Sequence, residues 1–241
     1  MTRRWCLLHG LGATGAVWAD VALQLRARGD QVICPDLPGH GDRAPLEAYT
    51  LNTLTDGIVS ACDGDPGIVV GHSLGGYVAL QWANGSYATE PSAVLTVGAK
   101  LSFTAEERLH MQALAAKPAR TFDSEAEAIA RYRKVAGLEA SIGAQERHLA
   151  RGVRATGDAW RLSQDPAANG IVVPPFADML AGARCRVIAS AGEHDPMVPM
   201  VQLREWVPDA VQFERAGHNA HVETPEAVVA LLTRIADLAS V

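Results

Sequence analysis

The 241-residue sequence is poor in cysteine and has no dense cluster of metal-binding side chains. Its four cysteines are scattered, form no CxxC pair and accompany no group of histidines, which argues against a thiolate metal site. They are Cys6, Cys34, Cys62 and Cys185. We therefore expect that the protein binds no metal.

Long apolar runs and blocks of like charge are also absent. The apolar run that begins at Trp5 is too short for a signal peptide, and no later run reaches the length of a membrane span, so we expect a cytoplasmic protein without membrane contact. The formal net charge of −6 argues against a surface that binds nucleic acid. Hydrophobic residues make up 48% of the chain and charged residues 20%, which is enough to build a buried core.

Strand-like and helix-like segments alternate in the first part of the chain and again near its end. The strand-like segments are 5–8, 31–34, 68–70, 93–97, 186–190 and 211–214. The helix-like segments are 17–28, 51–62, 74–83, 198–206 and 224–238. Such alternation is typical of βαβ units with right-handed connections. It predicts an α/β fold with a mostly or wholly parallel sheet of about six strands and helices on both faces.

The segment 99–180 has a different pattern. It lacks clear strand signals and is punctuated by glycines and prolines. Helices are favoured over 105–116, 124–135 and 145–155. We interpret the segment as a helical insertion into a single α/β core, which consists of residues 1–98 and 181–241.

One serine lies at a position where its side chain is expected to be exposed. Ser73 lies in the stretch Gly-His-Ser-Leu-Gly, residues 71–75, directly between a strand-like run and a helix-like run. A tight strand-to-helix turn would strain the backbone of this serine, and side chains in place of the two glycines would clash as strand and helix approach. The spacing therefore predicts an exposed serine at the carboxyl end of a strand.

Other polar side chains follow the remaining predicted strands, at the edge where open parallel sheets bind their ligands. They include His9, Asp36, Asp195 and His218. A serine hydroxyl needs a base to accept its proton, neutral imidazole can do so near neutral pH, and a carboxylate fixes the imidazole tautomer. We expect the backbone N–H groups of Leu11 and Leu74 to bind the oxyanion that such chemistry creates.

Five motifs occur in a fixed order along the chain outside the insertion. They are HGLG (9–12), DLPGHG (36–41), GHSLGG (71–76), GEHDPMVP (192–199) and AGHNAHVETPE (216–226). With these motifs the chain resembles the α/β-hydrolase superfamily, in its serine esterase form with a helical lid. The resemblance implies Ser73 as nucleophile, Asp195 as acid and His218 as base, and it makes the segment 99–180 the lid.

The chain departs from the superfamily pattern at its start. Members usually begin with an antiparallel pair of strands before the strand that leads into HG, whereas only four residues precede Trp5. We therefore expect a sheet that lacks this pair and has six strands, all of them parallel.

The site assignments have alternatives. A serine in this position is also a common helix N-cap. His221 is an alternative base to His218, and Glu193 an alternative acid to Asp195, but the motif positions favour His218 and Asp195. Structural roles, mainly in shaping loops, are expected for His9, Asp36, His40, Asp42, His72 and Glu223.

Candidate substrate contacts near the catalytic edge are Trp18, Met197, Val198 and, from the insertion, Trp160. Further side chains of the insertion either pack it on the core or line the pocket; they are Phe103, Met111, Phe122, Tyr132, Phe176 and Met179. Arg147, Arg151 and Arg154 would share one face of a helix, with Arg161 further on. That face is either solvated or a site for a substrate carboxylate or phosphate.

We therefore expect a cofactor-free hydrolase that cleaves a small carboxylic ester through an acyl-enzyme. One alternative keeps the triad for another reaction, as in a thioesterase, lactonase, C–C bond hydrolase, lyase or perhydrolase. Another is a receptor that binds a small molecule without turning it over. The sequence carries no signal for an oligomeric state.

Overall fold

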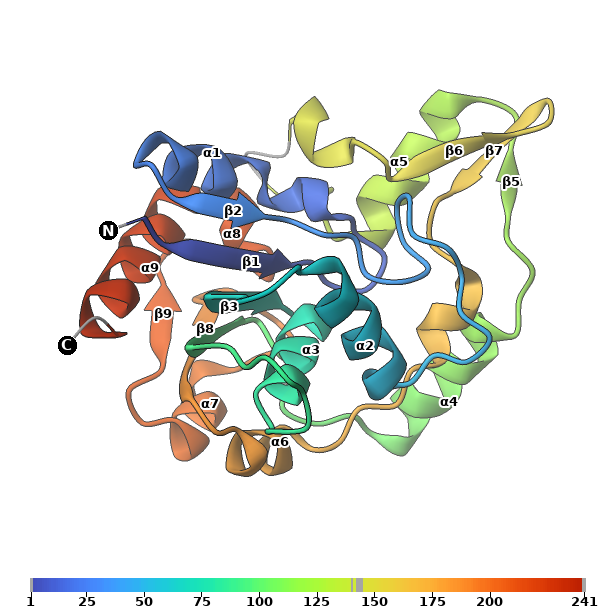
Figure 1. Cartoon of the computed structure of the whole chain (residues 1–241). Helices are drawn as coiled ribbons and strands as arrows, with labels where there is room; N and C mark the ends of the chain where they lie inside the picture. The colour runs from blue at the N-terminus through green and yellow to red at the C-terminus, as the bar shows by residue number, and fades with distance from the viewer. Residues whose placement is uncertain (1, 140, 142–144, 240–241) are drawn as a thin grey trace.

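The structure is a computed structural model that describes residues 2–139, 141 and 145–239, with side chains up to residue 236. Its centre is a six-stranded sheet in the order β2-β1-β3-β4-β8-β9 (Figure 1). The strands are β1 (Arg4–Leu8), β2 (Gln31–Ile33), β3 (Ile68–His72), β4 (Ala93–Val97), β8 (Arg186–Gly192) and β9 (Val211–Phe213). Every neighbouring pair is parallel, which confirms the predicted parallel sheet.

Helices cover both faces of this sheet, as predicted. On one face lie α1 (Ala19–Ala27) and α9 (Pro225–Ala239), and on the other lie α2 (Leu51–Ala61), α3 (Leu74–Trp82), α6 (Phe176–Gly182) and α7 (Met200–Trp206) (Figure 1). Because successive side chains of a strand point to opposite faces, β1 supplies both cores. Leu7 packs with the first group of helices, and Leu8 packs with the second.

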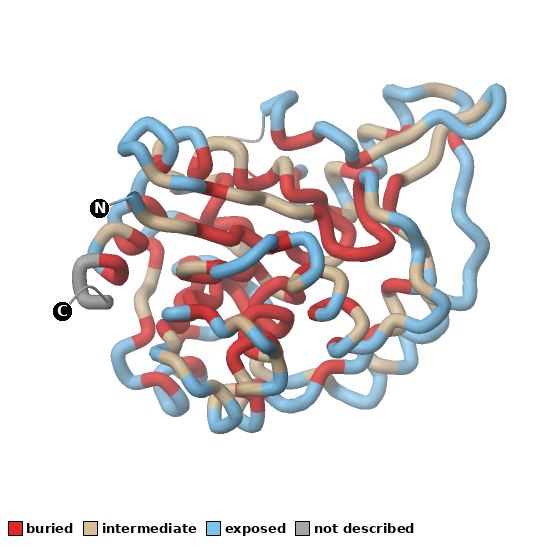
Figure 2. The backbone as a smooth tube through the Cα atoms, in the orientation of Figure 1, coloured by how far each residue is buried: buried red, intermediate tan, exposed pale blue. Residues whose placement is uncertain are grey.

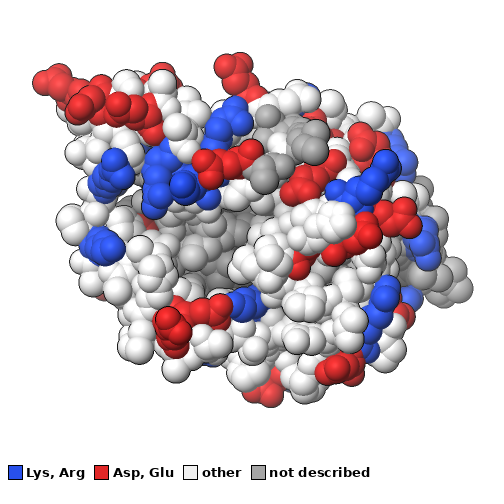
Figure 3. Space-filling model, turned by 180° about the vertical axis from the view of Figure 1, so that it is seen from behind, with Lys and Arg blue, Asp and Glu red and all other residues white. Residues whose placement is uncertain are grey.

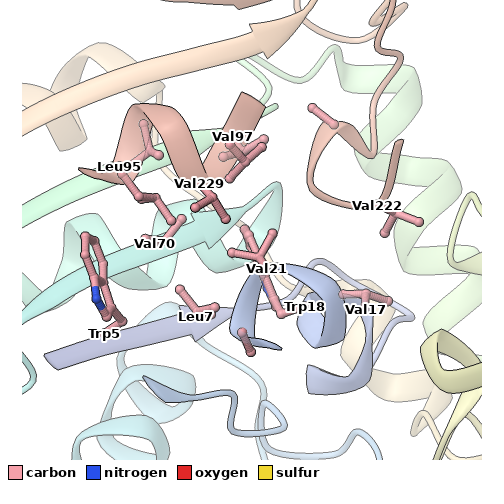
Figure 4. Close-up of a cluster of buried hydrophobic side chains, with 14 of the residues drawn as sticks. Trp5, Leu7, Val17, Trp18, Val21, Val70, Leu95, Val97, Val222 and Val229 are labelled. Carbon is pink, nitrogen blue, oxygen red and sulfur yellow. The ribbon is translucent and has the colours of Figure 1, made fainter. Parts of the chain in front are cut away.

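The first core contains large side chains that meet between the sheet, α1 and α9 (Figure 4). Trp5, Leu7 and Trp18 are each at most 1% exposed. Full burial of a side chain such as Leu7 contributes about 1.5–3 kcal/mol relative to exposure in water. Residues of β3 and β4 are buried throughout, which explains why these strands are nearly continuous apolar runs (Figure 2).

The insertion differs from the prediction, because it contains strands. Beside α4 (Ala105–Ala115) and α5 (Glu125–Val135), it forms a three-stranded antiparallel sheet in the order β5-β7-β6. The strands are β5 (Thr121–Phe122), β6 (Val153–Thr156) and β7 (Ala159–Leu162). The helix predicted over 145–155 is therefore wrong: only the short 3-10 helix η2 (Glu146–Leu149) forms, and β6 follows.

A hairpin explains this difference. Thr156 pairs with Ala159, so only Gly157 and Asp158 form the turn. Gly157 has φ 61°, and a glycine at the first central position is the requirement of a type II′ hairpin turn.

The expected end of the insertion, residue 180, lies inside α6, whose Phe176 packs against Tyr77 of α3. Among the described residues, no helix combines the length and apolar character needed to cross a membrane.

Candidate active site

Ser73 occupies the sharp turn between β3 and α3. Its backbone has φ 49° and ψ −114°, a strained conformation that costs about 1–3 kcal/mol and is concentrated at functional sites. A Cβ on Gly71 would lie 2.1 Å from the carbonyl oxygen of Gly75, so a side chain at position 71 would clash as predicted. Ser73 precedes α3 in the N-cap position, but its side chain makes no capping hydrogen bond. The hydroxyl is therefore not engaged in capping.

Asp195 and His218 form a close pair at the same end of the sheet. Nδ1 of His218 lies 2.9 Å from Oδ2 of Asp195; the aspartate side chain is fully buried, and that of the histidine is 20% exposed. Oδ1 of Asp195 accepts a second hydrogen bond, from the backbone N–H of Met197 at 2.8 Å. Since a carboxylate accepts hydrogen bonds, His218 carries its proton on Nδ1, which leaves Nε2 with a lone pair.

The end of β4 brings the serine turn and this pair together. The backbone N–H of Ser73 donates to the carbonyl of Val97 at 2.9 Å. The next residue, Gly98, packs under the pair: a Cβ there would lie 3.1 Å from Oδ2 of Asp195 and 3.2 Å from the His218 ring. Sequence reasoning missed Gly98, although its position after a predicted strand was a usable signal.

The alternative acids have other partners. Glu193 is bonded by the backbone N–H of Arg215 at 2.8 Å. Asp36 is buried and accepts the backbone N–H groups of Gly15 at 2.8 Å and Asp42 at 3.2 Å. Both carboxylates therefore organise loops, as expected for Asp36.

The alternative base, His221, is fully buried, and burial lowers its pKa to about 3. Its ring lies between the rings of Trp18, at 4.3 Å, and His72, at 4.5 Å. Neither ring nitrogen has a hydrogen-bond partner in the part of the chain that the structure describes. His221 is thus a neutral packing residue.

Two histidines hold the glycine-rich loop after β1. Nε2 of His9 accepts the N–H of Leu37 at 2.8 Å, and Nε2 of His40 accepts the N–H of Gly12 at 3.2 Å. Each Nδ1 faces a backbone carbonyl, of Gly10 or Pro38 respectively. Burial lowers the pKa of His40 to about 4 and that of His9 well below its usual value, so both rings stay neutral and can accept.

The hydrogen bonds of His9 and His40 fix the shape of the loop that contains Leu11. Among the described residues, the backbone N–H groups of Leu11 and Leu74 have no hydrogen-bond acceptor in the protein. The insertion reaches the same loop, because a Cβ on Gly12 would lie 2.6 Å from Val135 and 3.4 Å from Oε1 of Gln164. Sequence reasoning did not single out Val135 and Gln164, since only the tertiary fold brings them to Gly12.

The candidate substrate contacts occupy different environments. Met197 is 38% exposed and, with His218, lines an open groove of about 1220 Å³ that extends along β9 and α9. Trp160 is half-buried on β7. Trp18 and Val198 are almost fully buried, one in each core cluster.

Seen from behind, the surface is hollowed near its middle, with lysine and arginine side chains gathered on the rim above (Figure 3).

The predicted basic helix face does not exist, because its residues lie in η2, a turn and β6. Arg147 pairs with Asp20 at 3.1 Å, and Arg151 lies 3.5 Å from Asp36. Arg154 donates to the carbonyl of Gly41 at 3.1 Å. These contacts attach the insertion to the core.

Glu223 has the role expected for it. Its Oε2 accepts the backbone N–H of Gly217 at 2.5 Å, directly before His218, and its Oε1 accepts the hydroxyl of Ser141 at 3.3 Å. No group of three or more His, Cys, Asp or Glu side chains could hold a metal ion in the described ranges.

Comparisons with known proteins find relatives among ester hydrolases. The pimeloyl-(acyl-carrier protein) methyl ester esterase of Aromatoleum aromaticum is 30% identical over 244 residues, covering 94% of this chain and 95% of the relative. The enzyme of the same name from Chromobacterium violaceum is 29% identical, covering 88% and 85%. An uncharacterised Mycobacterium tuberculosis protein is 40% identical over 81 residues, so the chain spans only 24% of its length.

Solved structures share the fold at low sequence identity. E-2-(acetamidomethylene)succinate hydrolase superposes with a TM-score of 0.79 at 21% identity, covering 98% of this chain and 92% of that chain. An esterase from Mycobacterium tuberculosis gives 0.75 at 20% identity, covering 97% and 84%. The model of the alpha/beta hydrolase family matches residues 7–231, nearly the whole chain, and the chain therefore belongs to this family.

Proposed function

We propose that the protein hydrolyses a small carboxylic ester with Ser73 as nucleophile, His218 as general base and Asp195 as the acid that orients it. The observation that carries the proposal is the Asp195–His218 pair at 2.9 Å, at the strand end where Ser73 occupies its strained turn. The names of the two long-matching relatives, both ester esterases, support cleavage of an ester.

The residues divide the reaction into two steps. The hydroxyl oxygen of Ser73 attacks the ester carbonyl carbon while its proton passes to Nε2 of His218, and the departing alkoxide takes that proton to leave as the alcohol. Water then loses a proton to the same nitrogen and attacks the acyl carbonyl carbon. The bond from that carbon to the Ser73 oxygen breaks, the oxygen takes the proton back from Nε2 of His218, and the carboxylic acid is released. Asp195 stabilises the imidazolium that forms in each step.

The oxyanion would be bound by the backbone N–H groups of Leu11 and Leu74. Both are free of protein acceptors within the described residues. Leu74 directly follows Ser73, and Leu11 lies in the glycine-rich loop. Loss of one such donor typically costs about 3–4 kcal/mol of barrier. Met197 and Trp160 are the candidate contacts for substrate, while Trp18 and Val198 support the site from the core.

The test is turnover of a panel of short and medium p-nitrophenyl esters, with the matching acyl-thioesters, lactones and a dienoate. Ser73→Ala should abolish ester turnover and labelling by a fluorophosphonate, while circular dichroism and the Tm stay close to wild type. Undiminished turnover by Ser73→Ala would refute the proposal. A folded wild-type protein that gives no Ser73 adduct and hydrolyses nothing would favour a receptor.

A further inference from the structure

His72 is the last residue of β3 and directly precedes Ser73. Its side chain is 4% exposed, and its Nε2 lies 3.0 Å from the backbone carbonyl oxygen of His218. Because a carbonyl only accepts, Nε2 must carry the proton and donate it. The opposite nitrogen, Nδ1, is buried and has no hydrogen-bond partner among the described residues. One neutral tautomer, protonated on Nε2, fits this environment.

Packing leaves the His72 ring little freedom. Its centre lies 4.7 Å from that of the His218 ring and 4.5 Å from that of His221. On another side lies Gly10, where a Cβ would come within 2.8 Å of Nδ1 and 3.2 Å of the Cβ of Ser73. Burial and the neighbouring histidines lower the pKa of His72 well below its usual value, which keeps the ring neutral.

We propose that His72 is a positioning residue that sets the backbone of His218 relative to Ser73. This inference rests on the proposed function, because it assigns a role to the distance between nucleophile and base. His72 is joined to Ser73 by a peptide bond and to His218 by a hydrogen bond. Its rigid side chain therefore links the serine turn to the loop that contains His218.

The role is distinct from that of Asp195. Asp195 bonds the ring of His218 through Nδ1, whereas His72 bonds its main chain. Glu223 holds the preceding amide, of Gly217. Without His72 the ring would keep its tautomer, but the loop could move away from the serine turn. Misplacement of reacting groups by about 1 Å can cost about 10²-fold in rate.

The variants separate the hydrogen bond from the packing. His72→Phe keeps a flat ring but cannot donate, and its kcat should fall by about 10- to 100-fold with KM within about twofold. In His72→Gln the side-chain amide can donate to the same carbonyl and should restore a large part of kcat. His221→Phe is the matched control, because its ring packs on His72 without a bond to His218, and its kcat should stay near wild type. The Tm of each variant is measured alongside.

Three readouts keep the inference falsifiable. Fluorophosphonate labelling of wild-type Ser73 comes first: if it fails, the proposed function is wrong independently of His72. If labelling succeeds and His72→Phe has wild-type kcat and labelling rate, the positioning role is overturned. NMR of the wild-type protein with ¹⁵N-labelled histidine should show His72 protonated on Nε2. Protonation on Nδ1 would overturn the inference even if no variant folds.

Discussion

At the scale of single residues, glycines are what allow the candidate site to form. Gly71 lets β3 and α3 meet around Ser73, and Gly75 lets α3 approach the end of β1. Gly98 leaves room for the His218–Asp195 pair. Gly98 also has φ 63°, a conformation that other residues rarely adopt. Close backbone approach, together with the hydrogen bond from the Ser73 N–H to the carbonyl of Val97, therefore holds the strained serine in place.

Gly71→Ala should lower the free energy of unfolding by about 3 kcal/mol or more, because the added Cβ would meet the backbone of Gly75 at 2.1 Å and overpack the turn. Urea unfolding followed by circular dichroism measures the change. Gly182→Ala, at the end of α6, is the control. In the described part of the chain, no atom beyond the neighbouring residues and the helix's own backbone lies within 4 Å of a Cβ there, so the change should be neutral or stabilising by up to about 1 kcal/mol. Equal effects of the two changes would contradict the steric argument.

At the scale of elements, a group of polar contacts made by Asp20 and Thr14, which we call the latch, attaches the insertion to the core. His148 of η2 is fully buried and bonds Asp20 of α1 at 2.9 Å, and Arg147 reaches the other oxygen of this carboxylate at 3.1 Å. The hydroxyl of Thr14 donates to the carbonyl of Ala150 at 2.9 Å. These hydrogen bonds add to the apolar packing of Tyr132 and Leu149 in the first core, so α1 and η2 form one part of the contact between core and insertion.

Asp20→Ala should loosen this latch. Removal of the carboxylate leaves a ring nitrogen of His148 buried without a partner, at a cost of about 1–3 kcal/mol in the free energy of unfolding. Hydrogen exchange should accelerate over residues 146–162 before it changes in the central sheet. Asp123→Ala, at an exposed position of the insertion, should leave exchange there unchanged. Identical exchange in Asp20→Ala and wild type would argue against a latch.

The elements of the insertion also show where sequence patterns fail. β3 and β4 are buried on both faces, and their nearly continuous apolar runs predicted them. β6 has only four residues, ends in exposed positions and contains an arginine, so its alternation is too short to separate from a helical pattern. Its hairpin partner β7, and not its own composition, makes it a strand.

At the scale of the whole molecule, neutral imidazoles gather where the central strands end. His9, His40, His72 and His221 are all buried, and burial lowers the pKa of each. In the unfolded chain these groups have pKa values near 6.5. Between that value and the lower folded value, the unfolded state binds more protons, so the free energy of unfolding falls as the pH falls.

His221→Phe should make stability less sensitive to acid. The wild-type ring titrates at a pKa of about 3 when folded, so its contribution is present above pH 6.5 and is lost as the pH falls toward 3, by up to about 1.4 kcal/mol per pH unit. Urea unfolding at pH 7, 5.5 and 4 should therefore give a shallower decline for the variant. His110→Gln, at an exposed position of α4, should decline like wild type. A decline as steep in His221→Phe as in wild type would contradict this account.

The sequence alone determined the serine turn and the order of strands and helices in the α/β core, because apolar periodicity and glycine spacing act within a few neighbouring residues. Only the tertiary structure decided which histidine contacts Asp195 and where Val135 approaches Gly12. It also decided that His9 and His40 each accept a hydrogen bond from the loop that contains the other. Such contacts join positions far apart in the chain. Their distances depend on how whole elements pack, and no local pattern encodes that packing.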